Sequence, residues 1–99
     1  MQQRVHPTDR LLLVDDDPVF LRTLQRSLER RGFIVDAHQT VEAASEALDN
    51  ETYTHALLDL RLGDGSGLDL LEKASRTQPH ARCVILTGYG NVPTAVTAT

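Results

Sequence analysis

Apolar residues along the chain occur in short runs that alternate with longer segments in which every third or fourth residue is apolar. The runs Leu11–Val14, Ala56–Leu58 and Cys83–Leu86 are apolar at consecutive positions, as expected of strands that are buried on both faces of a parallel sheet. The segments between them have the spacing of amphipathic helices. This alternation predicts an α/β domain in which helices cover the faces of the sheet.

Capping residues mark the ends of the expected helices. Asp17, Pro18 and Gly32 predict a helix that begins with Pro18 and stops at Gly32. An acid at the N-cap, proline in the first turn and glycine after the last turn are typical of helix ends. Thr40 is expected to cap a second helix. The remaining expected elements are a strand over Phe33–Ala37, a second helix with Val41, Ala44, Ala47 and Leu48 on one face, a strand over Ala56–Asp59, a short helix with Leu68, Leu71 and Ala74 facing inward, a strand over Arg82–Leu86, and the start of a fourth helix over Pro93–Thr99.

Length and composition indicate one ordinary globular domain. The chain has 99 residues, of which 40% are hydrophobic and 24% charged, and its net charge is −4. Its basic residues are scattered along the chain, without a stripe that could follow a phosphate backbone, so we expect no direct nucleic-acid contact by this segment. The single cysteine, Cys83, lies in an apolar run and is predicted to be a small buried hydrophobe. No apolar stretch is long enough to span a membrane, and we expect a cytoplasmic protein.

Chemically active side chains follow the ends of three expected strands. Asp15, Asp16 and Asp17 come after the first strand, Asp59 ends the third, and Thr87 follows the fourth. In an open parallel sheet, sites form at the carboxyl edge of the strands, beside the point where the strand order reverses. If the order is 2-1-3-4, the first and third strands are neighbours, and their acids meet.

Clustered carboxylates repel one another, so such a group requires a raised pKa or a bound cation. Oxygen ligands suit Mg²⁺, which can neutralise a phosphoryl group that approaches an aspartate. Asp59 would then attack the phosphorus to form an acyl phosphate, and Thr87 would donate a hydrogen bond to a phosphoryl oxygen. Helix capping alone also explains the acidic run before the first helix. An acid after two leucines of a buried strand, as at Asp59, is costly without a partner or a function.

Three segments resemble the signature blocks of response-regulator receiver domains: Leu-Val-Asp-Asp-Asp-Pro, Leu-Leu-Asp-Leu-Arg-Leu-Gly-Asp-Gly-Ser-Gly-Leu and Ile-Leu-Thr-Gly-Tyr-Gly. The last block is similar to that of redox-responsive global regulators of the RegA/PrrA/ActR type. The resemblance implies a CheY-like, flavodoxin-like doubly wound parallel sheet with the order 2-1-3-4. Residues 1–9 would be an N-terminal tail and residues 10–99 the receiver domain.

The resemblance also implies roles for individual residues. By the family's pattern, Asp59 is the phosphate acceptor, Asp16 is a direct Mg²⁺ ligand and Asp15 binds the ion through water. Arg61 would contribute its backbone carbonyl, and Thr87 would be the switch hydroxyl. The implied donor is a sensor histidine kinase and the implied result is control of a transcriptional output, without turnover of an external substrate.

The sequence departs from the family at its C-terminal end. Receivers have a fifth strand that ends in a lysine, followed by a fifth helix, whereas this chain ends twelve residues after Thr87. Its only lysine, Lys73, lies on the third expected helix and is expected to face solvent. We therefore expect a receiver that is incomplete at its C-terminus, with Cys83–Leu86 as an unpaired apolar edge. That edge, or the fourth-helix region, would promote self-association.

Two other interpretations remain open. Without the lysine of the fifth strand, the chain could be a pseudo-receiver that serves only as an interaction module. A phosphohydrolase of the haloacid-dehalogenase type would also place an aspartate nucleophile at a strand end. That family has a second acid two residues later, where this chain has Arg61.

Overall fold

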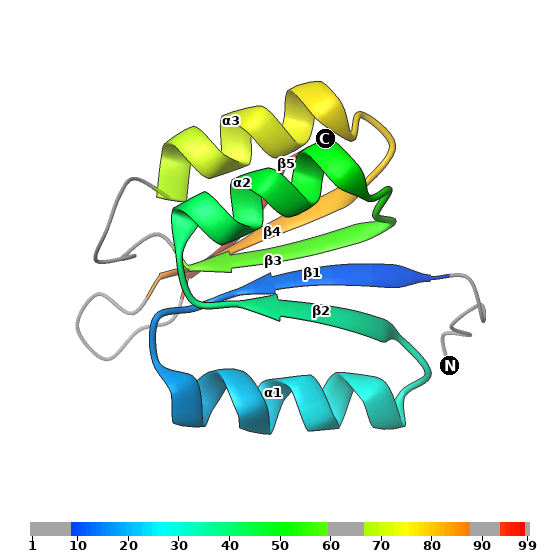
Figure 1. The fold of residues 1–99 in the computed structure, drawn as a ribbon, viewed down its shortest axis with the longest axis vertical. Coiled ribbons are helices and arrows are strands. Elements are labelled where there is room, and N and C mark those ends of the chain that lie inside the picture. Colours follow the sequence, from blue (N-terminus) through cyan, green and yellow to red (C-terminus); the bar gives the residue numbers. More distant parts are fainter. Residues whose placement is uncertain (1–8, 60–66, 88–93, 99) are drawn as a thin grey trace.

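The computed structural model describes residues 9–59, 67–87 and 94–98, which form one sheet flanked by helices (Figure 1). In chain order, the elements are β1 (Arg10–Val14), α1 (Pro18–Arg30), β2 (Ile34–His38), α2 (Val41–Asn50), β3 (His55–Asp59), α3 (Gly67–Thr77), β4 (Arg82–Thr87) and β5 (Thr94–Ala98). Helix α1 lies on one side of the sheet, and α2 and α3 lie together on the other. Among these helices, none has the length and apolar character needed to cross a bilayer.

The strands follow the order β2-β1-β3-β4-β5. The first four strands are parallel, and β1 lies between β2 and β3. The chain therefore leaves β1 toward one edge of the sheet and later returns to the other side of β1, which creates a switch point at the carboxyl ends of β1 and β3. The expected α/β class and the order 2-1-3-4 are confirmed for these strands.

Local capping interactions fix both ends of α1. The Asp17 carboxylate accepts hydrogen bonds from the backbone N–H groups of Val19 and Phe20, at 3.0 and 3.2 Å. Pro18 occupies the first turn, where its missing N–H removes no helical hydrogen bond. After the helix, Gly32 has a φ of 104°, a left-handed conformation that glycine adopts without steric cost. The predicted boundaries of this helix are confirmed.

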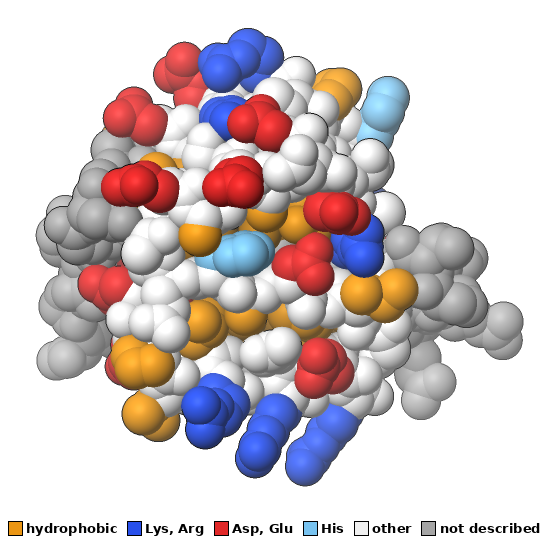
Figure 2. Space-filling view, in the orientation of Figure 1, with side chains coloured by type: hydrophobic (Ala, Val, Ile, Leu, Met, Phe, Trp, Pro, Cys, Tyr) orange, Lys and Arg blue, Asp and Glu red, His pale blue; other side chains and the backbone are white. Residues whose placement is uncertain are grey.

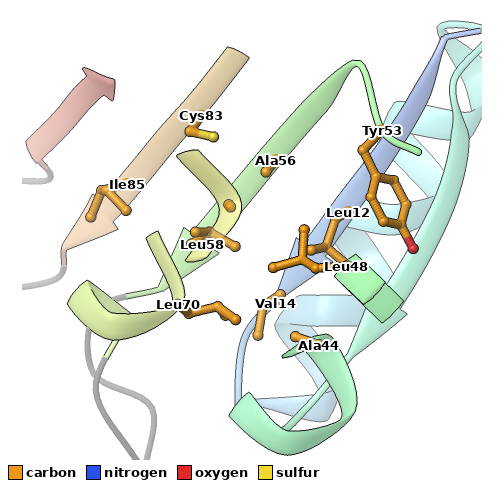
Figure 3. Packing of buried hydrophobic residues seen from close by; sticks show 11 residues of the cluster. Leu12, Val14, Ala44, Leu48, Tyr53, Ala56, Leu58, Leu70, Cys83 and Ile85 are labelled. Carbon is orange, nitrogen blue, oxygen red and sulfur yellow. The ribbon is translucent and has the colours of Figure 1, made fainter. Parts of the chain in front are cut away.

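The larger hydrophobic core fills the space between the sheet and helices α2 and α3. Figure 3 shows side chains of β1, β3 and β4 pointing toward residues of these two helices. Each leucine that is fully buried here stabilises the fold by about 1.5–3 kcal/mol relative to an exposed one. Cys83 is a free cysteine that is 1% exposed, as predicted. The buried members of this core are Leu12, Val14, Ala44, Leu48, Tyr53, Ala56, Leu58, Leu70, Ala74, Cys83 and Ile85.

A smaller core lies under α1 on the opposite face of the sheet. Leu21 is buried there, with Leu24 and Leu28 of the same helix partly buried, against Leu11 and Leu13 of β1. Successive residues of a strand point to opposite faces, so β1 supplies side chains to both cores. This explains why its residues are apolar at consecutive positions.

The prediction that Leu68 of α3 faces inward is wrong. Leu68 is 62% exposed, whereas Leu70 and Ala74 are buried. The helix begins at Gly67, and the spacing i, i+3, i+7 places Gly67, Leu70 and Ala74 on the face that meets the sheet. Leu68 lies on the flank of that face.

The segment that was expected to begin a fourth helix forms a strand instead. Thr94–Ala98 pairs antiparallel with β4 along Cys83–Thr87. Its threonine and valine residues are β-branched and favour extended backbone, and pairing satisfies the free N–H and C=O groups that an edge strand would otherwise expose. The expected helix over Pro93–Thr99 and the expected unpaired edge at Cys83–Leu86 are therefore wrong. Self-association through that edge loses its structural basis.

Candidate functional site

Three acids meet at the carboxyl ends of β1 and β3. Val14 is the ladder partner of Leu58, so the residues that follow them, Asp15 and Asp59, leave the two strands side by side. One carboxylate oxygen from each of Asp15, Asp16 and Asp59 lies within 4.8 Å of the other two. The strand order thus brings together the three acids that the sequence analysis grouped.

The three acids have different surroundings. Asp15 and Asp59 are each 8% exposed, whereas Asp16 is exposed. Asp15 Oδ1 accepts a hydrogen bond of 2.9 Å from the backbone N–H of Asp17, a contact that aspartates commonly make with the residue two positions later. Sequence analysis did not anticipate this bond, although an aspartate two residues before an N-cap has the geometry for it. The Asp15 carboxylate is consequently held at the edge of the sheet.

The site concentrates negative charge around Asp15. Burial raises the pKa of Asp15, the hydrogen bond from Asp17 partly opposes this effect, and the charges of Asp59, Asp16 and Asp17 raise the pKa further. These neighbouring charges are all negative. A proton or a bound cation would therefore relieve the repulsion among the carboxylates.

The arrangement of the acids fits a small, hard cation. Mg²⁺ binds oxygen at about 2.1 Å, so two of its ligands lie at most about 4.2 Å apart. The separations among the three carboxylates, up to 4.8 Å, are close to this span. Because Asp16 is exposed to solvent, an ion held here would retain water ligands, as Mg²⁺ usually does.

Two further residues, Thr87 and Arg61, belong to the predicted site. Thr87 is the last residue of β4 and follows Leu86, which is the ladder partner of Asp59. Its backbone therefore reaches the same edge of the sheet as the acids, while its hydroxyl lies outside the described part of the chain. Arg61 also lies outside the described residues.

Lys73 is held by α2. Its ammonium group donates hydrogen bonds to Ser45 Oγ at 2.7 Å and to Asp49 Oδ2 at 2.9 Å. The side chain is 21% exposed, so the expectation that Lys73 faces solvent is wrong, because α2 provides two acceptors beside it. The only lysine of the chain thus connects α3 to α2.

A protein-family model described as the response regulator receiver domain matches residues 11–99. The chain belongs to this receiver family. The receiver superposes on a response regulator from Burkholderia pseudomallei with a TM-score of 0.79 and 38% identity, covering 85% of this chain and 49% of that one. That structure contains a phosphorylated aspartic acid, a calcium ion and citrate. A CheY-like receiver from Methanospirillum hungatei gives the same TM-score at 34% identity, covering 85% of this chain and 67% of its own. The expected flavodoxin-like fold is confirmed.

Curated relatives place the receiver near the regulators that its last signature block resembles. It is 46% identical to the acid tolerance regulatory protein ActR of Sinorhizobium medicae, over 95% of this chain and 48% of that protein. It is 48% identical to the photosynthetic apparatus regulatory protein RegA of Rhodobacter capsulatus, over 89% of this chain and 48% of that protein. The receiver thus spans about half the length of these two relatives.

Proposed function

We propose that this receiver is a phosphorylation switch in which Asp59 accepts a phosphoryl group from a sensor histidine kinase. The observation that carries the proposal is the buried carboxylate of Asp59 at the end of β3, which shares the sheet edge with two further acids within 4.8 Å. Such a cluster is costly to bury unless a counter-ion or a function retains it. The phosphorylated aspartic acid of the Burkholderia pseudomallei regulator supports the same chemistry.

In the proposed reaction, a carboxylate oxygen of Asp59 attacks the phosphorus of a phosphohistidine on the kinase. An O–P bond forms while the N–P bond breaks, and the imidazole leaves with the bonding electrons and takes up a proton. The product is an aspartyl phosphate, which water hydrolyses to the free carboxylate and inorganic phosphate. The negative charge of Asp15 and Asp16 opposes the approach of the phosphoryl group, so the reaction requires charge neutralisation.

Bound Mg²⁺ would supply this neutralisation. Asp16 and Asp59 would hold the ion directly, together with the backbone carbonyl of Arg61, and Asp15 would hold it through water. The hydrogen bond from the Asp17 N–H orients the Asp15 carboxylate, in the way that outer hydrogen bonds commonly fix groups around a metal.

The switch itself would run through Thr87 at the end of β4. Its hydroxyl would donate a hydrogen bond to a phosphoryl oxygen and move toward the phosphate. The receiver, which begins near residue 10, would turn over no external substrate and make no direct contact with nucleic acid. As part of a longer cytoplasmic regulator, it would control a transcriptional output.

Intact-mass spectrometry after incubation with acetyl phosphate and Mg²⁺ tests this function. The wild-type chain should gain the mass of one phosphoryl group, and Asp59→Asn should gain none. Asp49→Asn is the matched control, because it removes an exposed carboxyl group from α2 and should leave the gain intact. A phosphoryl group on Asp59→Asn would identify another acceptor and refute the proposal.

A second candidate function is an interaction module that is not phosphorylated. The position of Lys73 favours it, since the ammonium group of this lysine is bound to Ser45 and Asp49 and is therefore not available to pair with a phosphoryl group. In that case the wild-type chain would gain no mass. Beryllofluoride with Mg²⁺ would also leave its amide NMR spectrum unchanged.

A further inference from the structure

A groove of about 590 Å³ lies between the edge strand β2 and helix α2. Ala43 and Ala47 line it from α2. They are four residues apart and therefore neighbours on one side of the helix, and their methyl groups are too short to fill the space in front of β2. None of the three acids of the candidate site is among the described residues that line this groove. It is therefore a second, separate feature of the surface.

One side of the groove carries backbone groups of β2 that point away from the sheet. The N–H of Ile34 and the C=O of His38 bond to the residues that flank β1, at 3.0 and 3.2 Å. In a parallel ladder, alternate residues bond to the same neighbouring strand, so Val35 and Ala37 direct their N–H and C=O groups to the opposite edge. Among the described strands, β2 pairs with β1 alone. The side chains of Val35 and Ala37 pack in the core under α1, so it is their backbone that lines the groove.

The charged side chains around the groove are mainly acidic. Asp36, Glu46 and Glu51 line it, and Arg10 is the one Lys or Arg among the described lining residues. Arg10 is already paired, with Glu51 and, at 3.8 Å, with Asp36, whereas no ion pair of the described residues includes Glu46. Figure 2 shows acidic side chains gathered over α2. Negative charge is therefore in excess here, and it attracts a cationic partner.

We propose that the groove binds an extended basic segment of a partner protein, which adds to the sheet as a strand beside β2. The backbone of that segment would pair with the N–H and C=O groups of Val35 and Ala37, as peptides do when they extend the edge of a sheet. Successive side chains of a strand point to opposite faces. Lysine or arginine side chains at alternate positions would therefore point toward α2, where Glu46 and Asp36 lie.

The free strand edge and the acidic lining together favour this occupant over others. A small cation such as a polyamine would pair with the acids but would leave the outward backbone groups of β2 without a partner. A second copy of this chain would bring one acidic groove against another, because a symmetric dimer places the same residues opposite each other. A polyanion would be repelled. A basic extended segment supplies both the backbone partners and the positive charge.

NMR titration of the isotope-labelled chain with a short peptide of alternating lysine and threonine tests the proposal, since threonine favours extended backbone. The amide signals of Val35 and Ala37 should shift most. The same peptide with N-methylated backbone amides should bind about tenfold more weakly, the scale of two lost hydrogen bonds. A peptide with glutamate in place of lysine should leave these signals unchanged, because its charge has the same sign as that of the groove.

Glu46→Lys should weaken binding of the lysine peptide about fivefold, the scale of a partly exposed charge pair that becomes repulsive. Its matched control is Glu72→Lys, which makes the same charge change at an exposed position of α3 and should leave the affinity within about twofold. Ala37→Pro removes an outward N–H while the ladder to β1 stays intact, and it should weaken binding about tenfold. Thermal melts show whether Ala37→Pro is folded, and Ala47→Leu, which fills the groove, replaces it if it is not.

Several outcomes would overturn the proposal. These are unchanged amide signals of β2 in the presence of the lysine peptide, equal loss of affinity in Glu46→Lys and Glu72→Lys, and equal binding of the N-methylated peptide. Spermidine that binds as tightly as the peptide would show a cation site instead of strand addition. A dimer of the peptide-free chain that Ala37→Pro dissociates would show that a second copy occupies the edge. Asp59→Asn should bind the lysine peptide as the wild type does, which separates this groove from the proposed phosphorylation.

Discussion

Tyr53 donates a hydrogen bond of 2.8 Å from its phenolic oxygen to Asp36 Oδ2. Tyr53 is 2% exposed and directly precedes Thr54 and β3, whereas Asp36 lies in β2. Burial, followed by the hydrogen bond to Asp36, raises the pKa of Tyr53, so the hydroxyl remains a donor at neutral pH. Asp36 also lies 3.8 Å from Arg10 Nε. The hydrogen bond between Tyr53 and Asp36 therefore links the edge strand β2 to the segment that leads into β3.

Tyr53→Phe should lower the free energy of unfolding by about 1–2 kcal/mol, because it removes one hydrogen bond to a charged acceptor that is partly buried. Urea denaturation measures the loss. Asp36→Ala provides the test of mechanism, since the two residues interact directly. If Tyr53→Phe costs as much in the Asp36→Ala background as in the wild type, the bond does not carry the effect.

Gln78 connects three segments and should be intolerant of an apolar replacement. It is 8% exposed, its side-chain oxygen accepts from Tyr53 N at 3.1 Å, and its amide nitrogen donates to Leu48 O at 3.2 Å and Glu51 O at 2.8 Å. Gln78→Leu should cost about 2–4 kcal/mol, because it leaves several buried backbone groups without partners. Gln39→Leu, at an exposed position, should change stability by less than about 0.5 kcal/mol. Similar losses in both variants, measured by urea denaturation, would argue against this role.

Asp15 should make stability fall as the pH rises. Burial raises the pKa of Asp15 above 3.8, so just above pH 3.8 the folded chain binds more protons than the unfolded chain. Ionisation of Asp15 then costs stability, and the cost remains at neutral pH. Asp15→Asn keeps an oxygen that can accept from the Asp17 N–H. Without divalent ions, it should raise the free energy of unfolding at pH 7 by less than about 1 kcal/mol, the scale of partly solvated charge interactions.

The same substitution should have no stabilising effect near pH 3, where the wild-type carboxyl is protonated in both states. Mg²⁺ should stabilise the wild type more than Asp15→Asn at pH 7, since a ligand that binds only the folded state shifts the unfolding equilibrium. Guanidinium titrations at the two pH values measure both effects. A gain of equal size at pH 3 and pH 7 would show that the effect is not ionic.

His55 should make stability fall as the pH drops, which is the opposite of the effect of Asp15 and occurs in a higher pH range. Its ring packs edge-on against Phe33, with 5.0 Å between ring centroids. Burial lowers the pKa of His55 below 6.5, the charge of Asp9 opposes this, and Arg82 adds to it. The unfolded chain therefore binds a proton more readily below about pH 6.5, and stability falls as the pH drops through that range. His55→Gln should reduce this dependence, whereas His80→Gln, at an exposed position, should retain it. An unchanged slope in His55→Gln, from melts between pH 5 and 7, would contradict the assignment.

The elements that sequence patterns predicted correctly are those that local interactions define. Leu11–Val14 is apolar throughout because the strand is buried on both faces, and Asp17 and Thr40 each cap the helix that follows with their own side chains. Residues Thr94–Ala98 were assigned wrongly because their conformation depends on pairing with β4, a contact that no local pattern encodes. The prediction that Lys73 is exposed was wrong for the same reason, since the acceptors of its hydrogen bonds, Ser45 and Asp49, lie on another helix.

The acids of the site could be grouped from sequence because strand order alone brings the ends of β1 and β3 together. The hydrogen bond between Asp15 and the Asp17 N–H depends on the exact turn after β1, which composition does not specify. The alignment of Arg22 and Arg26 on one side of α1 was missed because basic residues were compared along the chain, whereas these two become neighbours only on the surface of a helix.

Asp17 belongs to two hydrogen-bonded units at once. Its backbone N–H binds the Asp15 carboxylate, and its own carboxylate binds the first free N–H groups of α1. A displacement of the Asp15 side chain therefore pulls on the residue that begins the helix. The carboxyl edge of the sheet, where Asp15 lies, is in this way joined to the N-terminus of α1 through a single residue.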